Sequence, residues 1–227
     1  MPACIGFYGG TFDPIHLGHL QVARAANTAF GFAGLHLVPS ADPPLRAATD
    51  ASAAQRLAMV RLAAAEQPGF LVDDRELHRA GPSYTYDTLA QLRVELGATQ
   101  PLAWLLGCDA LLHIERWHRW DALLTLAHIV VMDRPYVAAP KHPQVLRWIR
   151  DHRCERLEAV HEAHAGALVF FAGPRVQISA TAVRLRCRAG ASAADLLPLS
   201  VWHYICAQGL YGASGNSLTE RETDVCF

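Results

Sequence analysis

The stretch from Gly9 to Leu20 constrains the fold of this chain more than any other. It reads GGTFDPIHLGHL, after a short apolar run at 3–8 and before an alanine-rich segment with helical spacing at Leu20–Phe30. This order predicts a strand, a glycine turn and a helix. Glycine lets the backbone approach a ligand closely, and the N–H groups at the start of a helix favour an anion. The stretch therefore predicts an anion site.

Two histidines lie inside this stretch. His16 and His19 are three residues apart, so they share a face if the helix has begun there. A Gly-Gly pair after a strand is usually only a turn, and a lone histidine is usually packed or solvated. Their combination favours phosphate chemistry. The Gly-Lys-Ser/Thr of a P-loop does not follow these glycines, so the cationic role falls to the histidines.

Composition excludes several classes of protein. The chain has 227 residues, enough for one large α/β domain or two small ones, and 52% of them are hydrophobic. A net charge of −1 gives no excess of positive charge that would indicate binding to a nucleic acid. The six cysteines show no C-x-x-C pair or Cys/His cluster, which argues against structural zinc and a disulfide framework. With no membrane-length apolar run and no signal-like N-terminus, we expect a cytoplasmic protein without a membrane partner.

Strands alternate with helices along the rest of the chain. Further strands are predicted at Leu35–Pro39, Phe70–Val72, Leu102–Leu106, His128–Met132 and Ala167–Phe171. Helices are predicted at Ala53–Glu66, at Ser83–Leu96, around Ile114, Trp117 and Trp120, at Gln144–Asp151, from Ser179 or Thr181 to Gly190, and at Leu199–Gln208. The alternation favours an α/β fold, a doubly wound parallel sheet flanked by helices. We expect a single domain at 1–211 and a flexible tail at 212–227.

Polar or glycine-containing segments follow several of the predicted strands. They are Gly9–Gly10, the loop 40–46, Gly107–Asp109 and Arg134. In a doubly wound sheet, ligands bind outside the carboxyl ends of the strands, near the switch in strand order. These segments are therefore predicted to converge on one site.

The order G-G-T-F-D-P-x-H-x-G-H resembles the signature of the nucleotidyltransferases that carry an H-x-G-H motif. Further motifs resemble those of the bacterial nicotinate-mononucleotide adenylyltransferases in order and spacing, from the first strand to Tyr211. They are Ser83-x-Thr85-x-x-Thr88-Leu89, Gly107-x-Asp109, Trp117 and the run ISATAVR at 178–184. The resemblance implies a Rossmann-like fold. It also implies transfer of the adenylyl group of ATP to nicotinate mononucleotide, which gives deamido-NAD and pyrophosphate.

The resemblance also implies roles for individual residues. The implied catalytic residues are His16, His19, Arg46 and Arg184. The implied ATP-binding residues are Gly9, Gly10, Thr11, His16, His19, Gly107, Asp109, Arg134, Ser179, Thr181 and Arg184. The implied contacts to nicotinate mononucleotide are Thr11, Phe12, Ser83, Thr85, Trp117 and His118. Mg²⁺ is expected to accompany ATP, bound mostly by phosphates and water, without a metal site of the protein's own. Trp120 is expected in the core.

The chain departs from the family pattern in the loop after the second strand. The family usually carries P-P-H-K or P-P-H-R there, but this chain reads Pro43-Pro44-Leu45-Arg46, and Ser40-Ala41 replaces a common Asn pair. Three alternatives stay open: a sister enzyme for nicotinamide mononucleotide, one for phosphopantetheine, and a nucleotide-binding regulator without turnover. A dinucleotide-binding dehydrogenase is disfavoured because the first turn lacks G-x-G-x-x-G.

Overall fold

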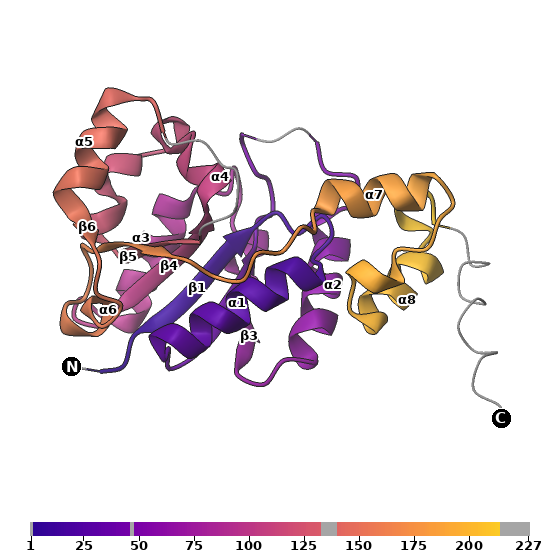
Figure 1. Ribbon diagram of the computed structural model, residues 1–227, viewed down its shortest axis with the longest axis horizontal. Helices are drawn as coiled ribbons and strands as arrows, with labels where there is room; N and C mark the ends of the chain where they lie inside the picture. Colours follow the sequence, from indigo (N-terminus) through magenta and orange to yellow (C-terminus); the bar gives the residue numbers. More distant parts are fainter. Residues whose placement is uncertain (1, 46–47, 133–139, 214–227) are drawn as a thin grey trace.

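A computed structural model describes residues 2–45, 48–132 and 140–213. These residues form one parallel sheet of seven strands in the order β3-β2-β1-β4-β5-β7-β6, with helices on both faces (Figure 1). The strands are β1 (Ile5–Gly10), β2 (Leu35–Pro39), β3 (Phe70–Val72), β4 (Leu102–Gly107), β5 (His128–Met132), β6 (Arg153–Cys154) and β7 (Leu168–Phe171). The predicted doubly wound, Rossmann-like architecture is confirmed.

The helices α1 to α6 lie in the connections between the strands, and α7 and α8 follow the last strand. The α-helices are α1 (Leu17–Phe30), α2 (Ala53–Ala65), α3 (Thr85–Leu96), α4 (Cys108–Leu111), α5 (Pro143–His152), α6 (Ala159–Glu162), α7 (Ala180–Arg188) and α8 (Leu199–Ala207). Short segments of 3-10 helix are η1 (Arg75–His78), η2 (Ile114–Arg116), η3 (Trp120–Thr125), η4 (Ala194–Leu196) and η5 (Leu210–Gly212). In Figure 1, α7 and α8 lie at the opposite end of the molecule from α5 and α6.

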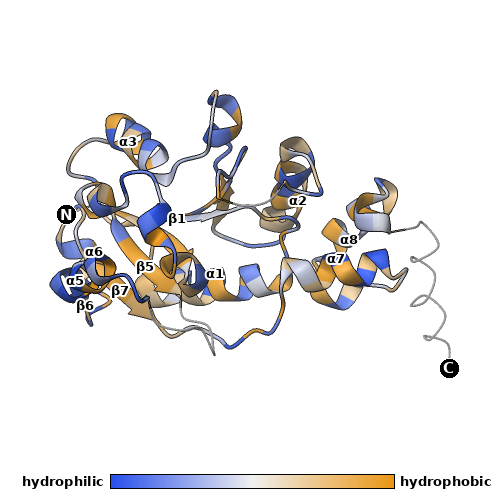
Figure 2. Ribbon diagram, turned by 90° about the horizontal axis from the view of Figure 1, so that it is seen from above, coloured by the Kyte–Doolittle hydropathy of each residue, from blue (hydrophilic) through white to orange (hydrophobic). Residues whose placement is uncertain are grey.

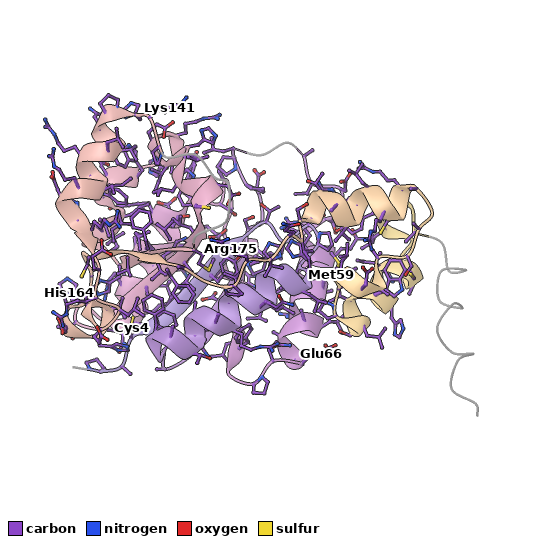
Figure 3. The ribbon with its side chains drawn as sticks, in the orientation of Figure 1. Cys4, Met59, Glu66, Lys141, His164 and Arg175 are labelled. Carbon is purple, nitrogen blue, oxygen red and sulfur yellow. The ribbon has the colours of Figure 1, made fainter. Side chains whose placement is uncertain are left out.

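The core has two parts, one on each face of the sheet. Successive residues of a strand point to opposite faces, so in β4 Leu105 packs on one side and Trp104 on the other. The first part is covered by α1, α2, α7 and α8 and includes Met59, which Figure 3 labels. The second part is covered by α3 and α5. Figure 2 shows β5 in hydrophobic colours and α5 largely in hydrophilic ones, as expected of a buried strand and a surface helix.

The strand order reverses between β1 and β4. From β1 the chain proceeds to β2 and β3 on one side, whereas β4 is followed by β5 on the other. Residues Tyr8 of β1 and Leu105 of β4 are paired in the register of this junction. Such a switch point leaves a crevice at the carboxyl ends of the strands, where ligands bind in folds of this kind.

The predicted glycine turn is wrong in detail. Gly9 and Gly10 are the last residues of β1, and the turn consists of 11–16, with Phe12 at a φ of 49° and a cis peptide bond before Pro14. Gly9 is needed for close packing, since a Cβ there would lie 2.1 Å from the Trp104 ring. The following helix begins at Leu17, not at Leu20, because His16 caps it.

Two other predictions are corrected. The helical stretch expected around Ile114, Trp117 and Trp120 is broken into α4, η2 and η3, with Arg119 in the left-handed conformation at a φ of 52°. Trp120 is only partly buried, against the edge of Trp148. The seventh strand, β6, was not predicted because its two residues are too few to show a pattern.

Some expectations fall outside the described residues. Arg46, Arg134 and residues 214–227 of the expected tail are among them. Tyr211 and Ala213, at the end of the described part, are both buried. No helix in the described ranges is long and apolar enough to cross a membrane.

Candidate active site

A cleft of about 500 Å³ opens at the carboxyl ends of β1, β2 and β4. Twelve of the predicted site residues line it: Gly9, Gly10, Thr11, Phe12, His19, Ser83, Thr85, Gly107, Asp109, Trp117, His118 and Arg184. His16, Ser179 and Thr181 do not line it, although Ala180 does. The convergence predicted for the loops after the strands is therefore present for the described residues.

The two histidines cap the first helix together. The His19 N–H donates to Nδ1 of His16 at 3.2 Å, and the His16 N–H donates to Nδ1 of His19 at 3.3 Å. Their rings stack with centroids 3.7 Å apart. The backbone N–H of His19 is therefore bound by the ring of His16 and does not face the cleft. Each Nδ1 accepts a hydrogen bond, so the proton of each neutral ring sits on Nε2.

The two histidines differ in access. His19 lines the cleft, whereas His16 is only 1% exposed. The ring of Phe12 meets the His19 ring edge to face at 5.2 Å and supports it from the turn. His19 is therefore placed to meet a ligand in the cleft, and His16 to hold His19.

The turn before these histidines is fixed by a buried carboxylate. Asp13 accepts hydrogen bonds from the N–H groups of Asp50 and Ala51 and from the hydroxyl of Tyr211 at 2.7 Å. Burial, with the nearby Asp13 charge, raises the pKa of Tyr211, so this hydroxyl stays protonated and donates. Three distant segments thus meet at one side chain.

Tyr211→Phe should lower the free energy of unfolding by about 1.5–3 kcal/mol, the usual worth of a hydrogen bond to a charged group. Urea unfolding of the two proteins measures the difference. Tyr204→Phe is the matched control, since the Tyr204 hydroxyl has no hydrogen-bond partner among the described residues. Equal stability of Tyr211→Phe and the control would show that Asp13 does not need this donor.

A buried arginine joins the loops around the cleft. The guanidinium of Arg56, in α2, donates to the carbonyl oxygens of Thr11, Ser40, Ala41 and Ala51 at 2.6–3.3 Å. Its side chain is fully buried, and burial lowers its pKa, with Asp13 acting against that shift. Arginine stays charged even so. From the sequence alone, Arg56 was only one residue of a predicted amphipathic helix, with no sign that it is buried.

Arg184 lies on the first turns of α7, whose N-cap is Ser179, one of the two predicted starts of this helix. Its Nη1 donates to the carbonyl oxygen of Asp13 at 2.7 Å, and its Nε lies 2.8 Å from a carboxylate oxygen of Asp50. The same carboxylate pairs with Arg188. Arg184 is therefore held against the turn at residues 11–16, which precedes the two histidines, at the edge of the cleft.

The opposite wall of the cleft is formed by the start of α3 and by the loop after η2. Thr85, Trp117 and His118 line it, and the rings of Tyr84 and His118 pack with centroids 4.7 Å apart. The helix begins at Thr85, so Ser83 is outside it. The Ser83 hydroxyl instead accepts the N–H groups of Ala41 and Asp42 at 2.9 and 3.2 Å.

Sequence reasoning missed several residues that line the cleft. Trp104 and Asp50 are among them, and so are Glu76 and Arg116. Trp104 lies in a continuous apolar strand, where a site residue looks like any core residue. Asp109 is in the first turn of α4, and Gly107 is the N-cap.

In the described ranges, no group of three or more His, Cys, Asp or Glu side chains could hold a metal ion. Asp109 is a carboxylate that lines the cleft. Magnesium is commonly bound by one or two carboxylates together with substrate phosphates and water, and this donor set fits that mode.

Comparison with known proteins agrees with this geometry. The cytidylyltransferase-like family model matches residues 7–186, which is more than half of the chain. A probable nicotinate-nucleotide adenylyltransferase of Aeromonas salmonicida is 48% identical over 213 residues, covering 94% of this chain and 99% of that protein. One from Stenotrophomonas maltophilia is 45% identical, covering 90% of this chain and 95% of that protein.

The fold is also found in solved structures. The nicotinic acid mononucleotide adenylyltransferase of Plasmodium falciparum, complexed with NaAD, matches with a TM-score of 0.70 at 18% identity, over 92% of this chain and 98% of that one. Fold, cleft and family model together define a cytidylyltransferase-like nucleotidyltransferase. Within that class, the chain belongs to the nicotinate-nucleotide adenylyltransferase family.

Proposed function

We propose that this protein transfers the adenylyl group of ATP to nicotinate mononucleotide, giving deamido-NAD and pyrophosphate. One observation carries the proposal. A single cleft brings His19 and Arg184 together with Thr85 and Trp117, although the four residues come from well-separated segments. Two cationic or donor groups on one side suit phosphates, and a hydroxyl with an indole on the other side suits an aromatic base.

The reaction needs positioning more than a protein nucleophile. An oxygen of the mononucleotide phosphate forms a bond to the α-phosphorus of ATP while the bond from that phosphorus to pyrophosphate breaks. Negative charge shifts to the departing oxygens, and donors aimed at that position stabilise the transition state. We assign this task to Nε2–H of His19 and to the guanidinium of Arg184. His16 would hold the His19 ring in the required orientation.

The ends of the substrates are assigned to the two sides of the cleft. Gly9 and Gly10 permit close approach of the nucleotide to β1, with Gly107 and Asp109 at the neighbouring strand for the ribose. Ser179 and Thr181, both exposed near Arg184, would serve the outer phosphates. Thr11, Phe12, Ser83, Thr85, Trp117 and His118 would surround the mononucleotide.

Magnesium is proposed to arrive with ATP, bound through phosphates and water. It would neutralise charge on the phosphates that are transferred and released. Asp109, one of the carboxylates that line the cleft, would bind its hydration shell.

Pyrophosphate release with ATP and three separate acceptors tests the function. Nicotinate mononucleotide should support turnover, while nicotinamide mononucleotide and phosphopantetheine should support far less. Preference for another acceptor would show that the protein has the activity of a sister enzyme instead. No release with any of the three would favour the regulator that binds nucleotides without turnover.

Arg184→Ala should raise the KM for ATP about tenfold or more and leave the KM for the mononucleotide nearly unchanged, because its guanidinium sits beside the histidine turn. Arg184→Lys should recover only part of the loss, since an ammonium lacks the planar fork that binds two phosphate oxygens. Steady-state kinetics with each substrate varied gives both values. Arg186→Ala is the control, because Arg186 pairs with Asp195 outside the cleft. Equal rises for both substrates would contradict this role.

A further inference from the structure

The guanidinium of Arg56 is fully buried, and its hydrogen bonds go to backbone carbonyl oxygens. Its Nη1 donates to the carbonyl oxygen of Thr11 at 2.7 Å and to that of Ser40 at 2.6 Å. Its Nη2 donates to the carbonyl oxygen of Ala41 at 2.9 Å, and its Nε to that of Ala51 at 3.3 Å. A buried cation bound in this way fixes the path of the backbone around it, because each bond that opens leaves a buried group without a partner.

One nitrogen of Arg56 joins the ends of two neighbouring strands. Thr11 follows β1 and begins the turn at residues 11–16, which leads to His19, whereas Ser40 is the first residue after β2. Both Thr11 and Ser40 line the cleft. The Ser40 N–H also donates to the carbonyl oxygen of Gly10 at 3.0 Å. The segment 40–42 is therefore held against the turn that precedes the histidines.

The same segment 40–42 is also bound to the start of the mononucleotide wall. The N–H groups of Ala41 and Asp42 donate to the hydroxyl oxygen of Ser83 at 2.9 and 3.2 Å. In return, the Ser83 N–H donates to the carbonyl oxygen of Asp42 at 2.9 Å. The segment thus connects the two sides of the cleft, since Arg56 binds it on one side and Ser83 on the other.

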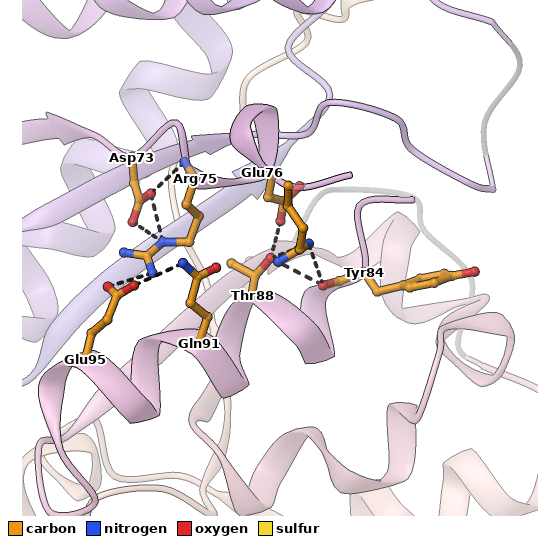
Figure 4. Close-up of polar contacts among 8 residues, drawn as sticks. Asp73, Arg75, Glu76, Tyr84, Thr88, Gln91 and Glu95 are labelled. Atoms are coloured by element: carbon orange, nitrogen blue, oxygen red, sulfur yellow. Dashed lines mark hydrogen bonds and ion pairs between the residues drawn. The ribbon is translucent and has the colours of Figure 1, made fainter. Parts of the chain in front are cut away.

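The wall at the start of α3 is held together by contacts of its own. The buried hydroxyl of Thr88 donates to Oε1 of Glu76 at 2.6 Å (Figure 4). Arg79 donates from Nη2 to the Thr88 hydroxyl at 3.1 Å and to the carbonyl oxygen of Tyr84 at 3.5 Å (Figure 4). These bonds join η1 to the first turn of α3, where Thr85 lines the cleft. The wall keeps its shape through these bonds, and its distance from the histidines depends on the segment 40–42.

We propose that Arg56 is a positioning residue for adenylyl transfer, which sets the distance between the two sides of the cleft through the segment 40–42. This proposal rests on the proposed function, in which His19 serves the phosphates of ATP and Thr85 serves the mononucleotide. A loosened segment leaves each binding surface intact but lets the attacking oxygen and the α-phosphorus move apart. A misplacement of about 1 Å costs on the order of 100-fold in rate.

The kinetic test compares Arg56→Lys with Arg61→Lys, which is the same substitution on the same helix. Lysine keeps the charge, but its three N–H groups come from one atom and cannot reach four carbonyl oxygens arranged around a planar fork. Arg61 is exposed and pairs with Asp74, and neither residue lines the cleft. Arg56→Lys should lower kcat about tenfold or more and change the KM for ATP and for nicotinate mononucleotide less than about threefold. Arg61→Lys should change none of these values.

Equilibrium binding separates positioning from a loss of folded enzyme. Calorimetric titration with each substrate alone gives its Kd and the fraction of chains that bind it, and kcat is expressed per binding chain. Deamido-NAD occupies both sides of the cleft, so in Arg56→Lys its Kd should rise about tenfold, while the Kd of each single substrate changes less than about threefold. A wild-type kcat per binding chain, an unchanged Kd for deamido-NAD, or a tenfold rise for a single substrate would overturn the positioning role.

Ser83→Ala loosens the same segment from its other side and decides the question if Arg56→Lys does not fold. Loss of a ligand contact alone would raise the Kd of deamido-NAD and of nicotinate mononucleotide by the same factor. Loss of positioning should raise the Kd of deamido-NAD by the larger factor, because deamido-NAD alone must reach both sides. Equal factors would overturn the proposal.

Hydrogen exchange distinguishes failure of this inference from failure of the proposed function, because it needs no substrate. In Arg56→Lys the amides of residues 40–42 should exchange about tenfold faster than in the wild type, while those of β4 are unchanged. In Arg61→Lys neither set should change. Unchanged exchange at 40–42 would overturn the role of Arg56 even in an active enzyme. Wild-type protein without turnover of nicotinate mononucleotide would overturn the proposed function, while faster exchange would still show that Arg56 holds the segment.

Discussion

His19→Ala is expected to lower kcat by about 100-fold or more. The loss of one oriented donor to developing charge has this scale in enzymes. The structure gives the donor a defined atom: Nδ1 of His19 accepts the N–H of His16, so the proton of the neutral ring lies on Nε2. The substitution also removes half of the reciprocal cap, which costs about 1 kcal/mol of stability and leaves the fold in place.

Single-turnover and steady-state rates with ATP and nicotinate mononucleotide measure the effect. His78→Ala is the matched control, because His78 is mostly exposed and pairs with Asp74 away from the cleft. Urea unfolding of both variants verifies that they are folded at the assay temperature. A His19→Ala protein with near wild-type turnover would remove His19 from the mechanism.

The second large effect is the preference for nicotinate mononucleotide over its amide, expected to reach orders of magnitude in kcat/KM. A carboxylate accepts hydrogen bonds and is charged, whereas a carboxamide presents an NH₂ group to the same donors. Donors near the Ser83–Thr85 turn and the Trp117–His118 backbone would lose their partner when the amide enters, and buried groups without partners discriminate strongly. Comparing kcat/KM for the two acceptors gives the ratio directly.

Two substitutions divide this preference into its causes. Trp117→Ala should raise the KM for both acceptors and hardly change their ratio, because stacking on the ring does not distinguish acid from amide. Thr85→Ala should reduce the ratio itself. A wild-type ratio near one would contradict the nicotinate assignment and leave adenylyl transfer intact.

The sequence predicted those parts of the molecule whose local hydrophobic pattern matches their position in the folded structure. The continuous apolar run of β4 and the alternation of strands with helices both indicate a buried parallel sheet. The segments after β1 and β4 are therefore predicted from the sequence to lie at one edge of the sheet. His19 was found because it lies in the first of these segments, whereas Thr85 and Trp117 were assigned through the resemblance to the family.

The rest depends on contacts between distant segments. Asp13 and Tyr211 are 198 positions apart, and Arg56 reaches carbonyl oxygens in two loops, at Thr11 and at Ser40. Nothing local marks such residues, since a buried arginine in a helix reads like a solvated one. Glu76 was missed for the same reason, as it stands in a polar connection. The glycine turn was misplaced because a tryptophan from another strand, not a turn, requires Gly9 to lack a side chain.

The hydrogen bond between Tyr211 and Asp13 has a consequence for biosynthesis. The turn that carries the histidines is synthesised well before Tyr211, yet its buried carboxylate obtains one donor from that residue, 198 positions later. Domains fold as units during or after synthesis. The side of the cleft that carries His19 therefore acquires its final geometry only after Tyr211 has emerged, long after the central strands β1 and β4 have been synthesised.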